Sequence, residues 1–197
     1  MFWSLKYKNE FKHSFIQIEY NMKIYTKTGD AGNTSLYDGS RARKFSVVFQ
    51  VLGEIDELNS RIGLLCTHMT DTDMLRKIQR TLQDFNSHIA TIDKTNKKLP
   101  DLPESLVLEL ENMIDEMEKV CPKLTKFILP GVTTPDALSH LCRTQARKAE
   151  RYIVDMHFSH KVEIPEIIMK YMNRLSDFFF VFARWICVKS GNTDYFL

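Results

Sequence analysis

Apolar residues recur every three or four positions over most of the chain beyond residue 47, which is the spacing of one face of a helix. This pattern predicts five helices, over residues 48–65, 75–92, 106–120, 135–156 and 165–186. Each helix has one apolar stripe that must meet another element, and the connections between them are of modest length. We therefore expect an all-α fold, a five-helix antiparallel bundle.

The predicted helix ends carry residues that usually mark such ends. Pro100 and Pro103 separate the second helix from the third, and Pro103 suits the first turn of a helix. For the fourth helix, Thr134 is predicted as the N-cap, Pro135 as the first helical residue and Asp136 as the acid of the first turn.

The last helix is apolar on nearly every side between Phe178 and Phe182. A helix of this kind is normally buried all round. We expect it to be the most buried element, with the alternative that its second apolar face meets another subunit.

Composition narrows the class of protein. The 197 residues are 44% hydrophobic and 26% charged, which is typical of one soluble globular domain and not of a disordered chain. The 7 glycines and 6 prolines are few for the turns of an all-β fold. The formal charge of +2 gives no overall basic excess for binding nucleic acid, so any anion site must be local. The longest apolar run, residues 178–183, is too short to span a membrane.

Residues 1–22 have no clear period, and we treat them as an accessory or targeting extension of a domain over residues 23–197. They contain no arginine and two glutamates, Glu10 and Glu19, whereas a mitochondrial transit peptide is normally rich in arginine and poor in acids. We expect a cytoplasmic protein, with the mitochondrial matrix as the alternative. The cysteines form no Cys-x-x-Cys pair and are expected to be reduced and mostly buried.

A polar segment from residue 26 to residue 35 has the composition of an anion-binding loop. It contains Lys27, Gly29, Gly32 and several hydroxyl side chains. Glycine lets backbone N–H groups approach a phosphate closely, hydroxyls donate hydrogen bonds, and lysine offsets negative charge. The segment is not a Walker A loop. The alternative interpretation is a polar connector.

A row of charges follows the outer face of the predicted fourth helix. At about 100° per residue, Arg143, Arg147, Glu150 and Arg151 fall on the side opposite its apolar positions. A stripe of this kind is often only a solvated surface. Three arginines around one glutamate nevertheless suit a polyanionic ligand.

Two carboxylates, Asp56 and Glu57, interrupt the apolar pattern of the first helix. They are candidates for a general acid and base, but an ion pair with an arginine on another element is the commoner role and the one we expect. A ferritin-like di-iron centre is excluded, because the only Glu-x-x-His spacing lies within residues 1–22. His157 and His160 are expected to cap a helix end, and no metal-binding residue is assigned.

Four segments, in the right order, resemble the PduO-type ATP:cob(I)alamin adenosyltransferases. They are KIYTKTGDAGNTSLYDG with Arg41 and Lys44, then GEIDELNSRIGL, then FILPG followed by RTQARKAER, and last YMNRLSDFFFVFAR. The resemblance covers residues 23–189. It implies an enzyme that transfers the 5′-deoxyadenosyl group of ATP to the cobalt of cob(I)alamin and releases triphosphate. It also implies a homotrimer of five-helix bundles, with ATP and corrinoid bound where subunits meet.

The resemblance further implies roles for individual residues. ATP would be held by a loop and by two helices. The loop residues are Thr26, Lys27, Thr28, Gly29, Thr34, Ser35 and Lys44. The helix residues are Arg147, Lys148, Glu150, Arg151 and Asn173. Asp56 and Arg143 would pair across a subunit boundary, and Phe127 would occupy the lower axial face of the corrin.

The reaction that the resemblance implies needs no side-chain base, because cob(I)alamin is itself a strong nucleophile and positioning dominates. Mg²⁺, lysine and arginine would stabilise the departing triphosphate. The apolar Phe127 cannot ligate cobalt, so it would displace the lower ligand and ease the reduction of cob(II)alamin. A reductase and an adenosylcobalamin-dependent acceptor enzyme are the protein partners that such a reaction implies.

Several positions depart from the family pattern. Phe45 and Ser46 stand where the family commonly has two acids, and Val48 and Gln50 replace an arginine and a glutamate. Lys148 replaces an arginine, which keeps the charge without the forked geometry. These departures keep open a second hypothesis, a non-catalytic cobalamin-binding escort protein. A third is an interaction bundle that binds neither ligand.

Overall fold

The computed structural model describes residues 25, 27–92 and 98–197. The predicted extension over residues 1–22, and Thr26 of the loop, lie outside the described residues. The described part contains five helices, which are α1 (Val47–Cys66), α2 (Asp73–Ile89), α3 (Ser105–Glu118), α4 (Thr134–Phe158) and α5 (Glu166–Lys189). The prediction of an all-α fold with five helices is confirmed, with helix ends that differ from the predicted ones by a few residues.

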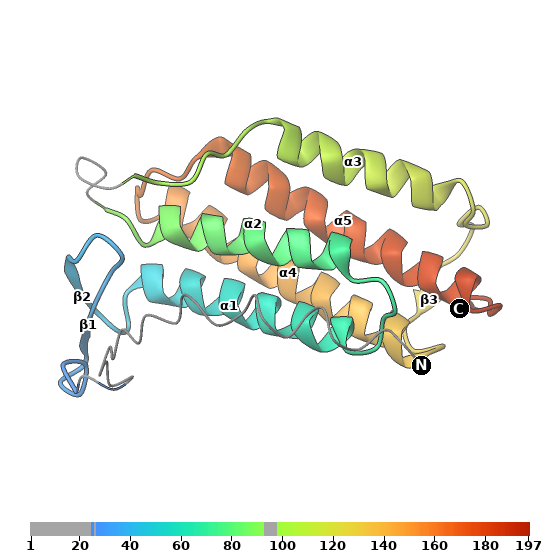
Figure 1. The fold of residues 1–197 in the computed structure, drawn as a ribbon, viewed down its shortest axis with the longest axis horizontal. Coiled ribbons are helices and arrows are strands. Elements are labelled where there is room, and N and C mark those ends of the chain that lie inside the picture. The colour runs from blue at the N-terminus through green and yellow to red at the C-terminus, as the bar shows by residue number, and fades with distance from the viewer. Residues whose placement is uncertain (1–24, 26, 93–97) are drawn as a thin grey trace, which may run out of the picture.

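Successive helices alternate in direction along the bundle, as the antiparallel prediction requires (Figure 1). α4 packs along both α5 and α1, α2 lies on α1, and α3 covers α5. α3 and α5 lie side by side, and because one helix, α4, separates them in the sequence, they run in the same direction. No helix in the described ranges is long and apolar enough to cross a membrane.

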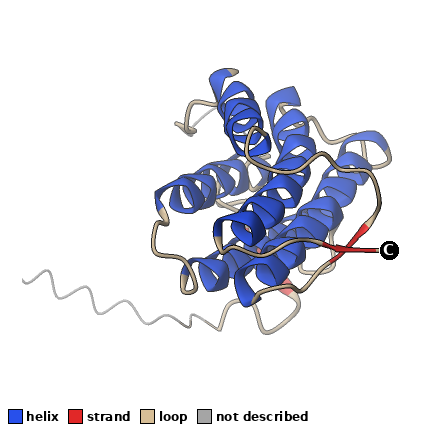
Figure 2. Cartoon of the chain, turned by 90° about the vertical axis from the view of Figure 1, so that its right-hand side faces the viewer, coloured by secondary structure: helices blue, strands red, loops and turns tan. Residues whose placement is uncertain are grey.

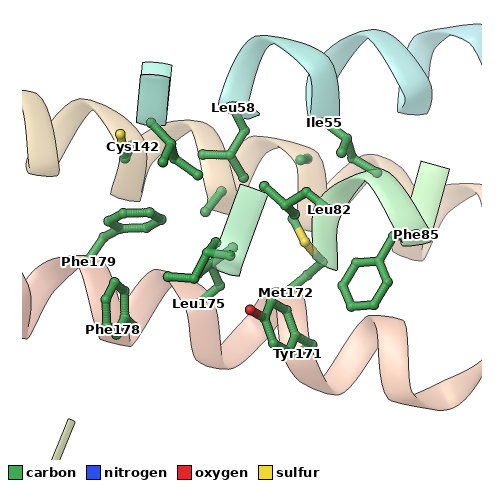
Figure 3. Close-up of a cluster of buried hydrophobic side chains, with 14 of the residues drawn as sticks. Ile55, Leu58, Leu82, Phe85, Cys142, Tyr171, Met172, Leu175, Phe178 and Phe179 are labelled. Carbon is green, nitrogen blue, oxygen red and sulfur yellow. The ribbon is translucent and has the colours of Figure 1, made fainter. Parts of the chain in front are cut away.

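The core is built around α5, which has more buried residues than any other described helix. The rings of Phe178 and Phe182 stack with centroids 5.4 Å apart, and Phe85 of α2 meets Tyr171 edge-on at 5.1 Å. Figure 3 shows Tyr171, Leu175 and Phe179 of α5 among side chains of α1, α2 and α4. The prediction that the last helix is the most buried is confirmed. Among the cysteines, burial raises the pKa of Cys142 to about 12.

The start of α4 differs from the prediction by one residue. The N-cap is Thr133, whose backbone is extended, and Thr134 is already helical. The Thr133 hydroxyl accepts from the Asp136 backbone N–H, and the Asp136 carboxylate accepts from the Thr133 backbone N–H, which is a capping box. Asp136 also accepts from the N–H groups of Gly131 and Val132, so this one carboxylate fixes the turn into α4.

Two short antiparallel strand pairs lie at opposite ends of the bundle (Figure 1). β1 (Asn33–Ser35) pairs with β2 (Arg41–Arg43) just before α1, and β3 (Ile128–Leu129) pairs with β4 (Tyr195–Phe196) near the start of α4. Figure 2 looks at the end of the bundle where the second pair lies. Strands of two or three residues leave no period in a sequence, so neither pair was predicted. The second pair fastens the C-terminus to the segment that precedes α4.

Candidate functional site

The predicted anion-binding loop is a tight turn that opens onto a lysine. The backbone N–H of Gly32 donates to the Gly29 carbonyl at 3.2 Å, and Lys27 and Gly32 both have positive φ. The Lys44 backbone N–H donates to the Gly32 carbonyl at 2.9 Å. A Cβ atom at Gly29 would lie 3.1 Å from the Lys44 Nζ. Glycine at position 29 therefore leaves the space that the ammonium group occupies.

The loop is fastened to the bundle by the β1–β2 hairpin. Arg41 donates through Nη2 to the Thr28 carbonyl at 3.0 Å. At the hairpin turn, the Tyr37 N–H donates to the Ala90 carbonyl at the end of α2, and the Asp38 carboxylate accepts from the N–H of Ile92. The two predicted hydroxyl residues of β1, Thr34 and Ser35, are half-buried and exposed respectively. The loop thus has a fixed position over the start of α1 and the end of α2.

The structure brings together Arg147, Glu150, Arg151 and Asn173 on neighbouring faces of α4 and α5. The Asn173 amide donates to the Glu150 carboxylate at 2.9 Å, which joins the two helices. Arg151 donates through Nη1 to the Arg147 carbonyl at 3.2 Å. Both arginines are exposed, so their guanidinium groups are open to an anionic ligand.

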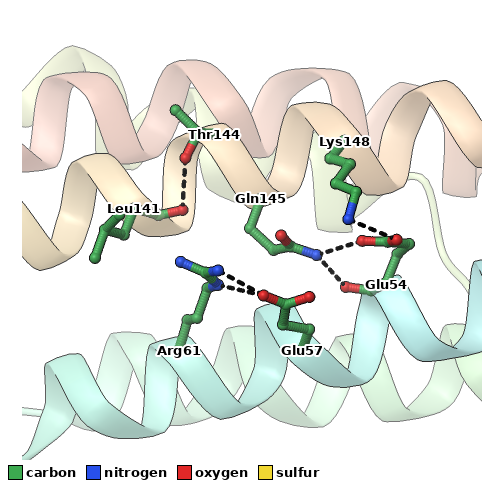
Figure 4. Close-up of polar contacts among 7 residues, drawn as sticks. All are labelled: Glu54, Glu57, Arg61, Leu141, Thr144, Gln145 and Lys148. Carbon is green, nitrogen blue, oxygen red and sulfur yellow. Dashed lines mark hydrogen bonds and ion pairs between the residues drawn. The ribbon is translucent and has the colours of Figure 1, made fainter.

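Lys148 faces α1 instead of joining the arginines. Its Nζ lies 2.8 Å from Oε1 of Glu54, and the other oxygen of that carboxylate accepts from the Gln145 amide at 2.7 Å (Figure 4). The Glu54 side chain is only 12% exposed, and its hydrogen bond to Lys148 raises the pKa of the lysine. The ammonium group of Lys148 therefore clamps α4 to α1.

The two acids of α1 have different surroundings. Glu57 pairs with Arg61 one turn along the same helix, so the expectation of an arginine on another element was wrong for this residue. A contact four residues apart forms locally, before tertiary packing is involved. Asp56 is exposed and lines a groove of about 410 Å³ between α1 and α2, with Tyr37 and Leu52 on its walls.

Arg143 is half-buried on α4, and its Nε donates to Nδ1 of His140 at 3.2 Å. Loss of hydration lowers the pKa of this guanidinium, and the nearby charge of Arg147 lowers it further. Within the described residues no ion pair joins Arg143 to a carboxylate, and Asp56 lies on a face of α1 away from α4. The predicted pairing of Asp56 with Arg143 across a subunit boundary stays a prediction.

Phe127 is an exposed aromatic residue on a well-anchored backbone. Its side chain is 83% exposed, it immediately precedes β3, and its carbonyl accepts from the Leu197 N–H at 3.0 Å. The C-terminal segment is held in turn by Arg184 of α5, which donates through Nε to Asp194 at 2.9 Å and through Nη2 to the Pro122 carbonyl at 2.6 Å. Both charged side chains of this pair are buried.

Within one copy of the chain, the loop and Phe127 lie at opposite ends of the helix bundle. The loop precedes the first residue of α1, and Phe127 precedes α4, whose start lies beside the last turn of α1 (Figure 1). A helix of 20 residues such as α1 is about 30 Å long. No hydrogen bond or ion pair between described residues joins the loop to the arginine set on α4.

Sequence reasoning missed four residues of these arrangements, namely Glu54, His140, Arg184 and Asp194. Arg184 gave one usable signal, because a charged residue inside an otherwise apolar helix needs a buried partner. Nothing in the sequence identifies Asp194 as that partner, since the contact forms only when the C-terminus folds back.

The chain is similar to known proteins of one family. A family model described as cobalamin adenosyltransferase matches residues 24–186. The corrinoid adenosyltransferase of Bacillus subtilis is 42% identical over 180 residues, which cover 88% of this chain and 91% of that protein. The human corrinoid adenosyltransferase MMAB is 38% identical over 181 residues, covering 87% of this chain and 72% of that protein.

Solved structures show the same similarity. A variant of the PduO-type ATP:corrinoid adenosyltransferase from Lactobacillus reuteri, complexed with cobalamin and ATP, superposes with a TM-score of 0.83 at 32% identity. The alignment covers 89% of this chain and 99% of that chain. The match to the family model spans the loop, the first four helices and most of α5. The chain therefore belongs to the cobalamin adenosyltransferase family.

Proposed function

We propose that this chain transfers the 5′-deoxyadenosyl group of ATP to the cobalt of cob(I)alamin, forming adenosylcobalamin and triphosphate. Its relatives are corrinoid adenosyltransferases, and one similar solved structure holds both cobalamin and ATP. The observation on the molecule that carries the proposal is Phe127, a ring 83% exposed on a backbone fixed by β4. An aromatic side chain without a ligating atom, carried on an anchored backbone, suits the underside of a corrin cobalt.

The triphosphate of ATP is assigned to the loop and to the arginine set on α4 and α5. The Gly32 N–H closes the tight turn on the Gly29 carbonyl, and the Lys44 ammonium group lies directly beside Gly29, so the lysine supplies a positive charge for phosphate at this turn. The other loop residues of the site are Thr26, which lies outside the described residues, and Lys27, Thr28, Thr34 and Ser35. The helix residues are Arg147, Glu150, Arg151 and Asn173.

The protein contributes position and electrostatics to the reaction. The cobalt(I) electron pair forms the bond to C5′ of ATP while the bond from C5′ to the triphosphate oxygen breaks. No proton has to move, so no side-chain base is needed. The arginines and lysines stabilise the negative charge of the departing triphosphate, which is worth most where the site excludes water.

Magnesium is assigned to the nucleotide and not to a protein centre. The described residues contain no cluster of three or more histidine, cysteine or acidic side chains suited to hold a metal ion. Mg²⁺ typically takes phosphate oxygens and waters with one or two carboxylates, so ATP supplies most of its ligands. Glu150 is the described acid that lies within the arginine set.

A neighbouring copy of the chain is needed to complete the site. Phe127 and the loop are separated by the length of α1, about 30 Å, which is too far for both to act on one corrin and one nucleotide. We assign the assembly as a homotrimer in which Asp56 of one copy pairs with the half-buried Arg143 of another. A groove of about 360 Å³ between α1 and α4, lined by Arg61, Leu138 and Leu141, adds exposed apolar surface on another side of α4.

We also propose two protein partners and a compartment. A reductase must supply the electron that converts cob(II)alamin to cob(I)alamin, and an adenosylcobalamin-dependent enzyme must accept the product. We place the domain at residues 23–197 with residues 1–22 as an accessory extension. The cytoplasm is the compartment we propose, and the mitochondrial matrix is the alternative.

One observation favours a second candidate, a cobalamin-binding escort protein without transfer activity. Lys148, which stands where the family commonly has an arginine, is engaged by Glu54 and so adds nothing to the arginine set. The set nevertheless keeps two exposed arginines and an oriented asparagine. These remaining contacts favour the enzyme over the escort.

The test is anaerobic incubation of the protein with cob(I)alamin and Mg-ATP, monitored by the visible spectrum of the alkylcobalt product. Turnover supports the enzyme, and binding of both ligands without turnover selects the escort. Arg147→Ala and Asn173→Ala are expected to abolish most turnover while the circular dichroism of the folded chain is unchanged. Arg80→Ala, at an exposed arginine of α2, is the matched control and is expected to leave turnover intact. Full turnover in both site variants would refute the residue assignment.

A further inference from the structure

A buried histidine lies one helical turn before Arg143 on α4. The His140 side chain is 5% exposed and meets the ring of Phe180 on α5, with centroids 6.1 Å apart and planes inclined at 65°. No step of the proposed transfer reaction uses this imidazole. A buried polar ring needs a hydrogen-bond partner, and here that partner is Arg143.

The hydrogen bond fixes both the tautomer and the direction of the guanidinium. Arg143 donates from Nε to Nδ1 of His140 at 3.2 Å. A guanidinium has donors only, so Nδ1 must carry a lone pair and the imidazole is neutral with its proton on Nε2. Because the bond uses Nε, the two Nη groups of Arg143 are left to form a forked contact with a carboxylate.

The surroundings keep the imidazole neutral. Burial lowers the pKa of His140, the charge of Arg143 lowers it further, and Asp136 and Asp194 act in the opposite direction. Arg143 and Asp136 belong to the same helix as His140, and Asp194 belongs to the C-terminal segment. From α5 the imidazole meets the uncharged ring of Phe180.

We propose that His140 is a positioning residue whose Nδ1 lone pair holds the Arg143 guanidinium in the orientation that pairs with a carboxylate of a second copy of this chain. The inference rests on the proposed function, which identifies that carboxylate as Asp56. His140 touches neither substrate, and it acts only through Arg143.

The arrangement makes assembly sensitive to acid. Protonation of Nδ1 replaces the acceptor by a donor and sets a second cation against Arg143. The pKa of His140 in the folded chain lies below its ordinary value of 6.5. The contribution of the neutral imidazole is therefore complete above pH 6.5 and is lost as the pH falls through the lowered pKa.

Two substitutions separate this role from a purely structural one. His140→Asn keeps an acceptor oxygen close to the position of Nδ1 and does not titrate. His140→Leu fills the space without an acceptor. The full chain and both variants are compared by analytical ultracentrifugation at pH 7.5 and at pH 5.5. We expect the unsubstituted chain to associate more weakly at the lower pH and His140→Leu to be weak at both, by about tenfold or more per interface. His140→Asn should associate equally well at both.

Arg143→Ala separates failure of this inference from failure of the proposed function. If Arg143→Ala associates as tightly as the unsubstituted chain, the proposed contact between copies is wrong. If Arg143→Ala associates weakly while His140→Leu does not, the contact stands and the positioning role is overturned. Acid sensitivity that persists in His140→Asn also overturns it. Should His140→Leu fail to fold, the pH profile of His140→Asn decides alone.

Discussion

The buried ion pair between Arg184 and Asp194 offers a quantitative test of how Phe127 is held. The two side chains are 4% and 7% exposed, and Nε of the arginine lies 2.9 Å from the carboxylate. Replacing only one partner leaves the other charge buried without compensation, which typically costs about 3–5 kcal/mol. Arg184→Met also removes a donor from the Pro122 carbonyl, but Pro122 is exposed, so water can replace that bond.

We therefore expect Arg184→Met and Asp194→Leu each to lower the free energy of unfolding by about 3 kcal/mol. In the double variant no charge remains buried, and a hydrophobic pair of similar volume is often nearly neutral. The double variant should therefore be more stable than either single variant, with a coupling energy of at least about 2 kcal/mol. Urea denaturation followed by circular dichroism at one protein concentration measures all four free energies, because association would otherwise shift them.

Loss of the ion pair should also loosen the pairing of β4 with β3, the strand that Phe127 precedes. The Leu197 N–H donates to the Phe127 carbonyl, so its hydrogen exchange reports whether the C-terminal segment is still in place. In each single variant, the Leu197 amide hydrogen should exchange with solvent faster than in the unsubstituted chain. The exchange rates of the buried amides of α1 should be unchanged. Additive free energies, within about 0.5 kcal/mol, together with unchanged exchange at Leu197 would refute the reasoning.

Three further substitutions test other parts of the site. Phe127→Ala should still bind corrinoid but stall at the reduction step, which the visible spectrum of bound cob(II)alamin reports, and a spectrum and rate equal to those of the unsubstituted chain would contradict the role of the ring. Gly29→Ala places a Cβ atom 3.1 Å from the Lys44 Nζ, so the ammonium group must move. The KM for ATP should rise severalfold with little loss of thermal stability. An unchanged KM would contradict the assignment of the loop to the triphosphate. Glu54→Gln removes the charge opposite Lys148 and should lower the unfolding temperature by a few degrees with the KM for ATP unchanged; a raised KM with no thermal effect would show that the lysine serves the nucleotide.

The bundle could be predicted from the sequence because the apolar spacing that marks a helix is a local pattern. The three-and-four spacing placed all five helices, and the apolar run around Phe179 identified α5 as the centre of the core. The cap of α4 was misplaced by one residue, since Thr133 and Thr134 are equally good caps and only the extended backbone at Thr133 distinguishes them. The ion pair of Glu57 was assigned to the wrong element, because a local partner at Arg61 forms without any tertiary contact.

By itself the sequence determined which residues are suited to phosphate and which to an apolar surface, since residue type and short-range spacing decide that. Only the tertiary structure decided that Lys148 turns to Glu54, that His140 holds Arg143, and that the C-terminus carries the strand beside Phe127. Each of these contacts depends on which helices pack against each other, which strands pair, and which side chains are buried together. Such contacts join residues far apart in the chain or depend on burial, and no local pattern records them.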